Sequence, residues 1–187
     1  MAGTNWSLKS KPRAWQSTAL ERWLEHNKGV VSVVTGGGKT MFAFLCMDVF
    51  AREHPDGRFI ILVPTITLLD RWYVSLQEDF GVVQKDIACF SSEEKPEKPA
   101  VINLLVINSG RSLVKKISAG VPCFLIVDEC HRAGSPEFDG GYWICAKKLP
   151  HPCASLIALP IFITSGRRCT DSLPKGKGWG ASGELTS

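Results

Sequence analysis

The segment at residues 30–40, VVSVVTGGGKT, constrains the fold of this chain more than any other stretch. Its β-branched residues favour a short buried strand, and three consecutive glycines at 36–38 then break that strand. Glycines let neighbouring backbone N–H groups turn towards one point, because no Cβ stands in the way, and so they form an anion-binding concavity. Residues 39–53 follow with helical spacing, which places a helix N-terminus, favourable to phosphate, directly after the glycines. This order of strand, glycine loop and helix predicts a phosphate-binding loop in an α/β fold.

Lys39 and Thr40 give the loop the side chains that a nucleoside triphosphate requires. In a phosphate-binding loop the lysine reaches the β- and γ-phosphates, and the hydroxyl of the next residue is a ligand of Mg²⁺. One position departs from the general Walker pattern, because Val33 stands where its first glycine falls. The alternative interpretation is a glycine-rich turn before a core helix. The strand, the glycines, the Lys–Thr pair and the helix in the required order favour the phosphate site.

An acidic pair, Asp128 and Glu129, follows the apolar run CFLIV at 123–127, which is typical of a buried strand. Hydrolysis of a triphosphate needs a metal and a group that activates water. Asp128 is therefore a candidate for the Mg²⁺ shell together with Thr40, and Glu129 is a candidate for polarising the attacking water. Such a pair is otherwise usually a solvated turn or a helix cap. The upstream glycine loop favours a catalytic group made of Glu129, Asp128 and Lys39.

Apolar runs and helical patterns alternate along the chain, which predicts a parallel sheet covered by helices. Strands are expected at 58–63, 86–90, 101–107, 123–127 and 155–159, and helices at 11–28, 39–53, 67–80 and 113–118, the last after a turn at 108–112. Ligands of such sheets bind outside the carboxyl ends of the strands. The glycine loop and the acidic pair both follow strand ends, so we expect them to meet at one edge of the sheet.

Gln16 lies near the start of the first helical pattern. A glutamine amide donates and accepts hydrogen bonds at once, as the N6/N7 edge of adenine requires. Alone, a glutamine in a helix is far more often a solvated polar residue. Its place upstream of the glycine loop makes it a candidate adenine reader.

Length, composition and cysteine pattern indicate one globular domain that lacks the disulfide pattern and signal peptide of a secreted protein. A chain of 187 residues can bury a substantial core, and a net charge of +4 is compatible with a nucleic-acid partner. The seven cysteines are scattered and form no C-x-x-C pair, which argues against structural zinc and favours free thiols in a reducing compartment. The N-terminus lacks the apolar region of a signal peptide, and the apolar run at 153–163 is too short to span a bilayer. We expect a cytoplasmic protein with no membrane partner.

Four short segments match known motifs in the same order along the chain: RAWQ at 13–16, VVTGGGKT at 33–40, VPT at 63–65 and DECH at 128–131. Together they resemble the motifs of superfamily-two helicases and translocases, in the helicase/restriction-type group whose first domain is RecA-like. The motif that 33–40 resembles also lacks the first Walker glycine in that family. The resemblance covers roughly residues 11–138.

The resemblance implies a role for each matching residue. It places Asp128 and Glu129 in a DExH motif, in which His131 would couple the ATP site to a later motif, although a lone histidine in a loop is usually a surface residue. It implies that Pro64, Thr65 and Arg111 contact a nucleic-acid backbone, Arg111 being the loosest match. The residues expected to bind ATP are Gln16, Thr35, Gly36, Gly37, Gly38, Lys39 and Thr40.

The implied fold is α/β, a P-loop RecA-like three-layer domain with a mainly parallel sheet that is incomplete at the C-terminus. We expect this domain over residues 1–140 and a divergent, partly disordered tail over residues 141–187. Two departures from the family matter. The Ser/Thr-Ala-Thr element expected after 156–159 is reduced to Thr164–Ser165, and the second RecA-like domain, with its arginines, is absent.

The sequence thus predicts the ATP-binding N-terminal domain of a DNA helicase or translocase, which binds ATP with Mg²⁺ and a nucleic-acid backbone. Its hydrolysis alone is expected to be weak or nil. DNA is preferred by resemblance and RNA is left open. A truncated or frame-shifted gene product and a partner chain that supplies the second domain are alternative explanations of the missing half. The alternative function is a non-catalytic truncated remnant that binds nucleotide or nucleic acid. A third possibility, a P-loop kinase or GTPase, is disfavoured by the DECH segment and by Gln16.

Overall fold

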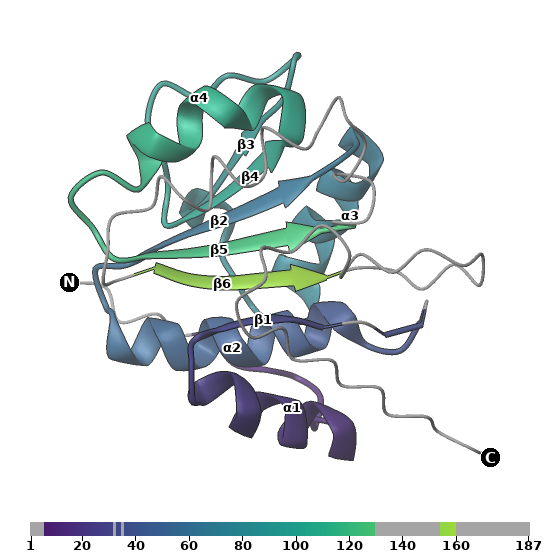
Figure 1. The fold of residues 1–187 in the computed structure, drawn as a ribbon. Coiled ribbons are helices and arrows are strands. Elements are labelled where there is room, and N and C mark those ends of the chain that lie inside the picture. The colour runs from purple at the N-terminus through teal and green to yellow at the C-terminus, as the bar shows by residue number, and fades with distance from the viewer. Residues whose placement is uncertain (1–5, 32, 35, 130–153, 160–187) are drawn as a thin grey trace, which may run out of the picture.

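Six parallel strands form a single sheet in the computed structural model, which describes residues 6–31, 33, 34, 36–129 and 154–159. The strand order across the sheet is β1-β6-β5-β2-β4-β3 (Figure 1). The strands are β1 (Lys28–Val30), β2 (Arg58–Val63), β3 (Ile87–Phe90), β4 (Ile102–Val106), β5 (Cys123–Asp128) and β6 (Ala154–Leu159). Every pair of neighbours is parallel, which confirms the predicted sheet.

Helices cover both faces of this sheet and make the domain a three-layer structure (Figure 1). They are α1 (Ala14–Leu24), α2 (Lys39–Glu53), α3 (Ile66–Glu78) and α4 (Ile107–Ile117), with a short 3₁₀ helix, η1 (Gln84–Asp86), before β3. Side chains of α1, α2 and α3 pack in one apolar cluster with one face of the sheet. Side chains of α4 pack in a second cluster with the other face.

The side chains of strand β2 pack against the helices on both faces of the sheet. Successive side chains of a strand point to opposite faces of the sheet. Phe59 and Ile61 belong to the cluster beneath α2 and α3, whereas Ile60 and Leu62 belong to the cluster beneath α4. A strand buried on both faces therefore appears in the sequence as the continuous apolar run FIILV rather than as an alternating pattern.

Several elements begin or end elsewhere than the sequence predicts. The helix expected at 11–28 is the shorter α1, and Lys28 already belongs to β1. The turn expected at 108–112 is the first part of α4, which starts directly after β4, because the helix is held by burial of Val114 and Ile117 rather than by its local composition. The strand before the glycine loop ends at Val30, and Val34 is 63% exposed instead of buried.

The last described strand, β6, lies inside the sheet although it belongs to the segment expected to be a divergent tail. Ile157 of β6 pairs with Gly29 of β1 on one side and with Ile126 of β5 on the other. A strand at 155–159 is therefore confirmed, and it separates β1 from the rest of the sheet. The domain boundary at residue 140 falls outside the described residues. Among the described helices, none combines the length and apolar character needed to cross a bilayer.

Candidate nucleotide-binding site

The carboxyl ends of β1 and β5 bring the glycine loop and the acidic pair to the same edge of the sheet. The loop at 31–38 follows β1 and leads into α2, whose first residue is Lys39. Asp128 is the last residue of β5, and Glu129 follows it. The sequence separates Lys39 and Glu129 by 90 residues, and the fold brings their side chains into contact.

The glycine loop has a conformation that other residues adopt only with strain. Gly36 and Gly38 have φ angles of +77° and +92°, in the left-handed region that favours glycine. A Cβ at Gly37 would lie 2.2 Å from Cγ1 of Val33, and a Cβ at Gly38 would lie 2.8 Å from Nε2 of Gln16. Backbone conformation and close packing therefore both require the run of glycines that the sequence contains.

Lys39 and Glu129 form an ion pair at the N-terminus of α2. The Nζ atom of Lys39 lies 3.4 Å from Oε1 of Glu129, and the two side chains are 12% and 8% exposed. Glu129 has a φ of 52°, which is uncommon for a residue with a Cβ. The structure thus holds the lysine expected to bind phosphate against the carboxylate expected to polarise water.

Asp128 is buried, and a different donor binds each oxygen of its carboxylate. Oδ1 accepts a hydrogen bond of 2.9 Å from the backbone N–H of Glu129, and Oδ2 accepts one of 2.8 Å from Nε1 of Trp72 in α3. A carboxylate oxygen has two acceptor positions, and the donors within the described residues leave one position on each oxygen for a further ligand. Trp72 lies in the helix predicted at 67–80, and its contact with Asp128 is not predicted from the sequence; the signal for it is that a buried indole N–H usually needs a partner.

The donor set at this edge fits Mg²⁺. This ion prefers oxygen ligands and is commonly bound by one or two carboxylates together with substrate phosphates and water. Asp128 provides a carboxylate with acceptor capacity to spare, and Thr40 provides a hydroxyl in the first turn of α2. Within the described residues no cluster of three or more His, Cys, Asp or Glu offers a second kind of metal site.

Gln16 binds the glycine loop and connects α1 to it. Its side chain is 1% exposed; Oε1 accepts a hydrogen bond of 2.7 Å from the backbone N–H of Arg13, and Nε2 donates one of 2.8 Å to the carbonyl of Gly38. Arg13 donates from Nη1 to the carbonyl of Gly37 at 3.1 Å. The adenine contact expected of Gln16 stays a prediction, whereas its contact with the loop is a finding. Arg13, which sequence reasoning gave no role of its own, is a second link.

The residues expected to contact nucleic acid lie on two other elements. Thr65 is exposed and caps α3, because its Oγ1 accepts a hydrogen bond of 3.3 Å from the N–H of Leu68, and Pro64 precedes it at the end of β2. Arg111 lies in α4, and its side chain is outside the described part of the structure. The positions Thr35, His131, Thr164 and Ser165 are likewise outside the described residues.

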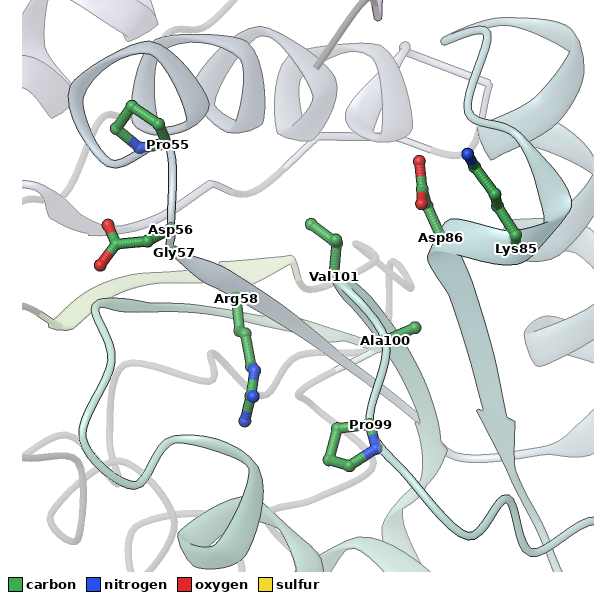
Figure 2. Close-up of a pocket in the computed structure, with 9 residues that line it drawn as sticks. All are labelled: Pro55, Asp56, Gly57, Arg58, Lys85, Asp86, Pro99, Ala100 and Val101. Atoms are coloured by element: carbon green, nitrogen blue, oxygen red, sulfur yellow. The ribbon is translucent and has the colours of Figure 1, made fainter. Parts of the chain in front are cut away.

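A hollow of about 310 Å³ lies at the opposite, amino edge of the sheet (Figure 2). Asp56, Arg58, Lys85 and Asp86 are among the residues that line it. The guanidinium of Arg58 is bound to the carbonyl of Ile117 at 2.8 Å. None of the site residues predicted from the sequence lines this hollow, so it is separate from the glycine loop and the acidic pair.

Comparison with known proteins places this geometry in a family. Residues 9–154 match the family model described as Type III restriction enzyme, res subunit. The DNA 3'-5' translocase XPB2 of Sulfurisphaera tokodaii is 27% identical over 146 residues, which are 77% of this chain and 29% of the translocase. The chain thus spans less than a third of the length of that relative.

Solved structures show the same fold at low sequence identity. The Pyrococcus furiosus Hef helicase domain superposes with a TM-score of 0.66 at 20% identity, over 86% of this chain and 35% of that one. The UvsW helicase of bacteriophage T4 gives 0.67 at 15% identity, over 83% and 55%. The Sulfolobus solfataricus SWI2/SNF2 ATPase core, solved in complex with dsDNA, gives 0.60 at 16% identity, over 88% and 34%. The chain therefore belongs to the family of the Type III restriction enzyme res subunit and is a first RecA-like domain of the superfamily-two helicase type.

Proposed function

We propose that this chain is the ATP-binding N-terminal domain of a DNA helicase or translocase, and that it binds ATP with Mg²⁺ at the carboxyl edge of its sheet. The observation that carries the proposal is the convergence of Lys39, Asp128 and Glu129 at the N-terminus of α2. A helix N-terminus that follows a glycine loop favours phosphate, and the lysine and the two carboxylates supply the remaining chemistry.

The ion pair between Lys39 and Glu129 gives the proposed site an order of events. A γ-phosphate competes with Glu129 for the ammonium of Lys39, because both are anions that bind the same donor. Once Lys39 binds phosphate, its ion pair with Glu129 is broken, and the carboxylate of Glu129 would orient water and accept its proton. Asp128 and Thr40 would hold Mg²⁺, which neutralises charge that develops on the phosphates.

Contact with a nucleic acid is proposed for Pro64, Thr65 and Arg111. The exposed Thr65 follows β2 at the same edge of the sheet as the glycine loop, and a net charge of +4 is compatible with a polyanion. Phosphate contacts do not distinguish DNA from RNA, so the preference for DNA comes from the translocase and ATPase relatives. In the proposed DExH motif, His131 would couple the ATP site to nucleic-acid binding.

The proposed domain organisation is a RecA-like unit over residues 1–140, to which β6 adds a strand, and a divergent segment up to residue 187. A second RecA-like domain, in a partner chain or in a longer protein, would supply the arginine that completes the ATP site. Such an arginine increases turnover by about 10³- to 10⁵-fold in related nucleotidases, so this chain alone should hydrolyse ATP weakly or not at all.

Two variants test the proposal. Lys39→Ala should abolish binding of a fluorescent ATP analogue, and Glu129→Gln should keep binding and lose residual hydrolysis measured with and without single-stranded DNA. Lys85→Ala is the matched control, because this exposed lysine lies beside the hollow at the opposite edge of the sheet. Undiminished affinity in Lys39→Ala would refute the phosphate site. Nucleotide binding without any turnover in the unsubstituted chain would indicate a half-site that needs the second RecA-like domain.

A further inference from the structure

We propose that Trp72 is a positioning residue for Asp128, whose indole N–H fixes the carboxylate in the orientation that Mg²⁺ requires. The inference rests on the proposed function, because it concerns the same metal site. It assigns to α3 a direct part in the ATP site, in addition to the contact with nucleic acid proposed for the residues at its start.

The hydrogen bond between Trp72 and Asp128 is short and buried. Nε1 lies 2.8 Å from Oδ2, and the two residues are 3% and 7% exposed. The backbone N–H of Glu129 binds the other oxygen, Oδ1, at 2.9 Å. One donor on each oxygen prevents the carboxylate plane from rotating, and hydrogen bonds to an ionised acceptor are stronger than neutral ones.

Packing holds the indole of Trp72 in place. Its ring meets Phe44 of α2 edge to face, with centroids 5.8 Å apart and an interplanar angle of 86°. Leu69 and Leu76, one turn away on either side in α3, are buried in the same cluster. Trp72 thus contacts the helix that begins with Lys39 and the residue that ends β5, so a shift of its ring would disturb both parts of the site.

A second buried tryptophan shows that burial alone does not demand this hydrogen bond. Trp23 of α1 is 4% exposed and packs on Phe124 at a centroid distance of 5.5 Å. Its Nε1 is buried and has no hydrogen-bond partner in the described part of the chain. The domain therefore tolerates a buried indole N–H without a partner at one position, and at the other it directs the N–H to the carboxylate proposed to hold the metal.

Two matched variants test the role of the N–H. Trp72→Phe and Trp23→Phe each remove one indole N–H and keep a buried aromatic ring. The measured quantity is the affinity for ADP in excess Mg²⁺ divided by the affinity in EDTA, which isolates the contribution of the metal. Residues that orient metal ligands contribute about 10- to 100-fold to metal affinity or activity, and we expect Trp72→Phe to lower the ratio within that range. The affinity in EDTA should not change, and Trp23→Phe should change neither value. An unaltered ratio in Trp72→Phe would overturn the inference.

Asp128→Asn separates this inference from the proposed function. If Asp128→Asn leaves the ratio unchanged, the proposed metal site itself fails. If Asp128→Asn lowers the ratio and Trp72→Phe does not, only the role of Trp72 fails. In the double variant, loss of the Trp72 N–H should have no further effect on the ratio, because the two groups act as one unit.

Nuclear magnetic resonance of the unsubstituted chain provides a second test, in which the variants serve only to assign the two indole resonances. In ¹⁵N-labelled protein, the indole N–H resonance of Trp72 should shift when Mg²⁺ is added to the ADP-bound chain, because the acceptor of that N–H binds the metal. The resonance of Trp23, identified by its loss in Trp23→Phe, should not move. An unmoved Trp72 resonance at saturating Mg²⁺ would contradict the proposal.

Discussion

Replacing Gly38 by alanine tests the connection between the glycine loop and α1. The φ of Gly38 is +92°, and a residue with a Cβ in left-handed conformation costs about 1–2 kcal/mol. The new Cβ would also lie 2.8 Å from Nε2 of Gln16 and would displace the amide that donates to the carbonyl of Gly38. Leaving this buried amide without its partner costs a further ~1–3 kcal/mol. Gly38→Ala should therefore lower the free energy of unfolding by about 2–5 kcal/mol.

Two other glycines provide controls for the backbone contribution alone. Gly36 and Gly120 have φ angles of +77° and +74°, and a Cβ at either position would meet no atom of the described residues within 4 Å. Alanine at each should cost only about 1–2 kcal/mol. The excess of Gly38→Ala over Gly120→Ala therefore measures the contact with Gln16 and not the strain of the turn.

Urea denaturation followed by circular dichroism gives these free energies, and an unchanged slope against denaturant confirms that the unfolded states are comparable. In a Gln16→Ala background the excess cost of Gly38→Ala should disappear, because the displaced amide is no longer present. A Gly38→Ala cost equal to that of Gly120→Ala, in the chain that keeps Gln16, would refute the proposed connection.

Three further perturbations test other parts of the fold. Ile157→Pro removes a backbone donor from a strand that is paired on both sides, so it should lower the free energy of unfolding by at least about 1–3 kcal/mol. It should also weaken ADP binding, because β6 holds β1 in the sheet. Calorimetry and a binding titration measure these two effects, and an unchanged melting temperature would contradict the pairing. Thr65→Ala removes the cap of α3 and should cost ~0.5–2 kcal/mol in urea denaturation, whereas no loss would mean that the side chain does not cap the helix. Burial raises the pKa of the Cys123 thiol from 9.0 to about 12, so the unfolded chain loses this proton at lower pH than the folded chain. The free energy of unfolding should therefore decrease as pH rises from 9 towards 12. The decrease should be smaller in Cys123→Ala. Iodoacetamide at pH 8 should alkylate Cys123 only after unfolding, as peptide mass spectrometry would show; rapid alkylation of the folded chain would refute its burial.

The sequence predicts those parts of the fold that depend on local patterns. The bounds of β2 match the predicted strand because its apolar run is uninterrupted, and α2 begins at Lys39 because the glycines end there. The start of α4 is mispredicted because residues 108–112 have the composition of a turn and are helical through packing further along the helix. Tertiary contacts override local propensity at such positions.

The sequence predicts which residues form the candidate site, but it does not predict which of their side chains contact one another. Lys39, Asp128 and Glu129 follow from their place after a glycine loop or a strand, because parallel strands bring their carboxyl ends to one edge. That Lys39 pairs with Glu129, and that Gln16 binds the loop, depends on side-chain positions from elements far apart in the sequence. The role of Trp72 was hidden because its indole has an apolar body and one polar atom, and only the body contributes to the helical pattern.

The position of β6 in the sheet has a consequence for the folding of the domain during its synthesis. The glycine loop is translated directly after β1, but the strand that pairs with β1 among the described residues is the later one at 154–159. At bacterial-type synthesis rates the interval between these two strands is on the order of ten seconds. Until then the growing chain has β2, β4 and β5 to assemble, while β1 lacks the strand with which it pairs among the described residues. The glycine loop is thus translated well before the strand that holds β1 in the sheet, so we expect ATP to bind the completed domain and not to guide its early folding.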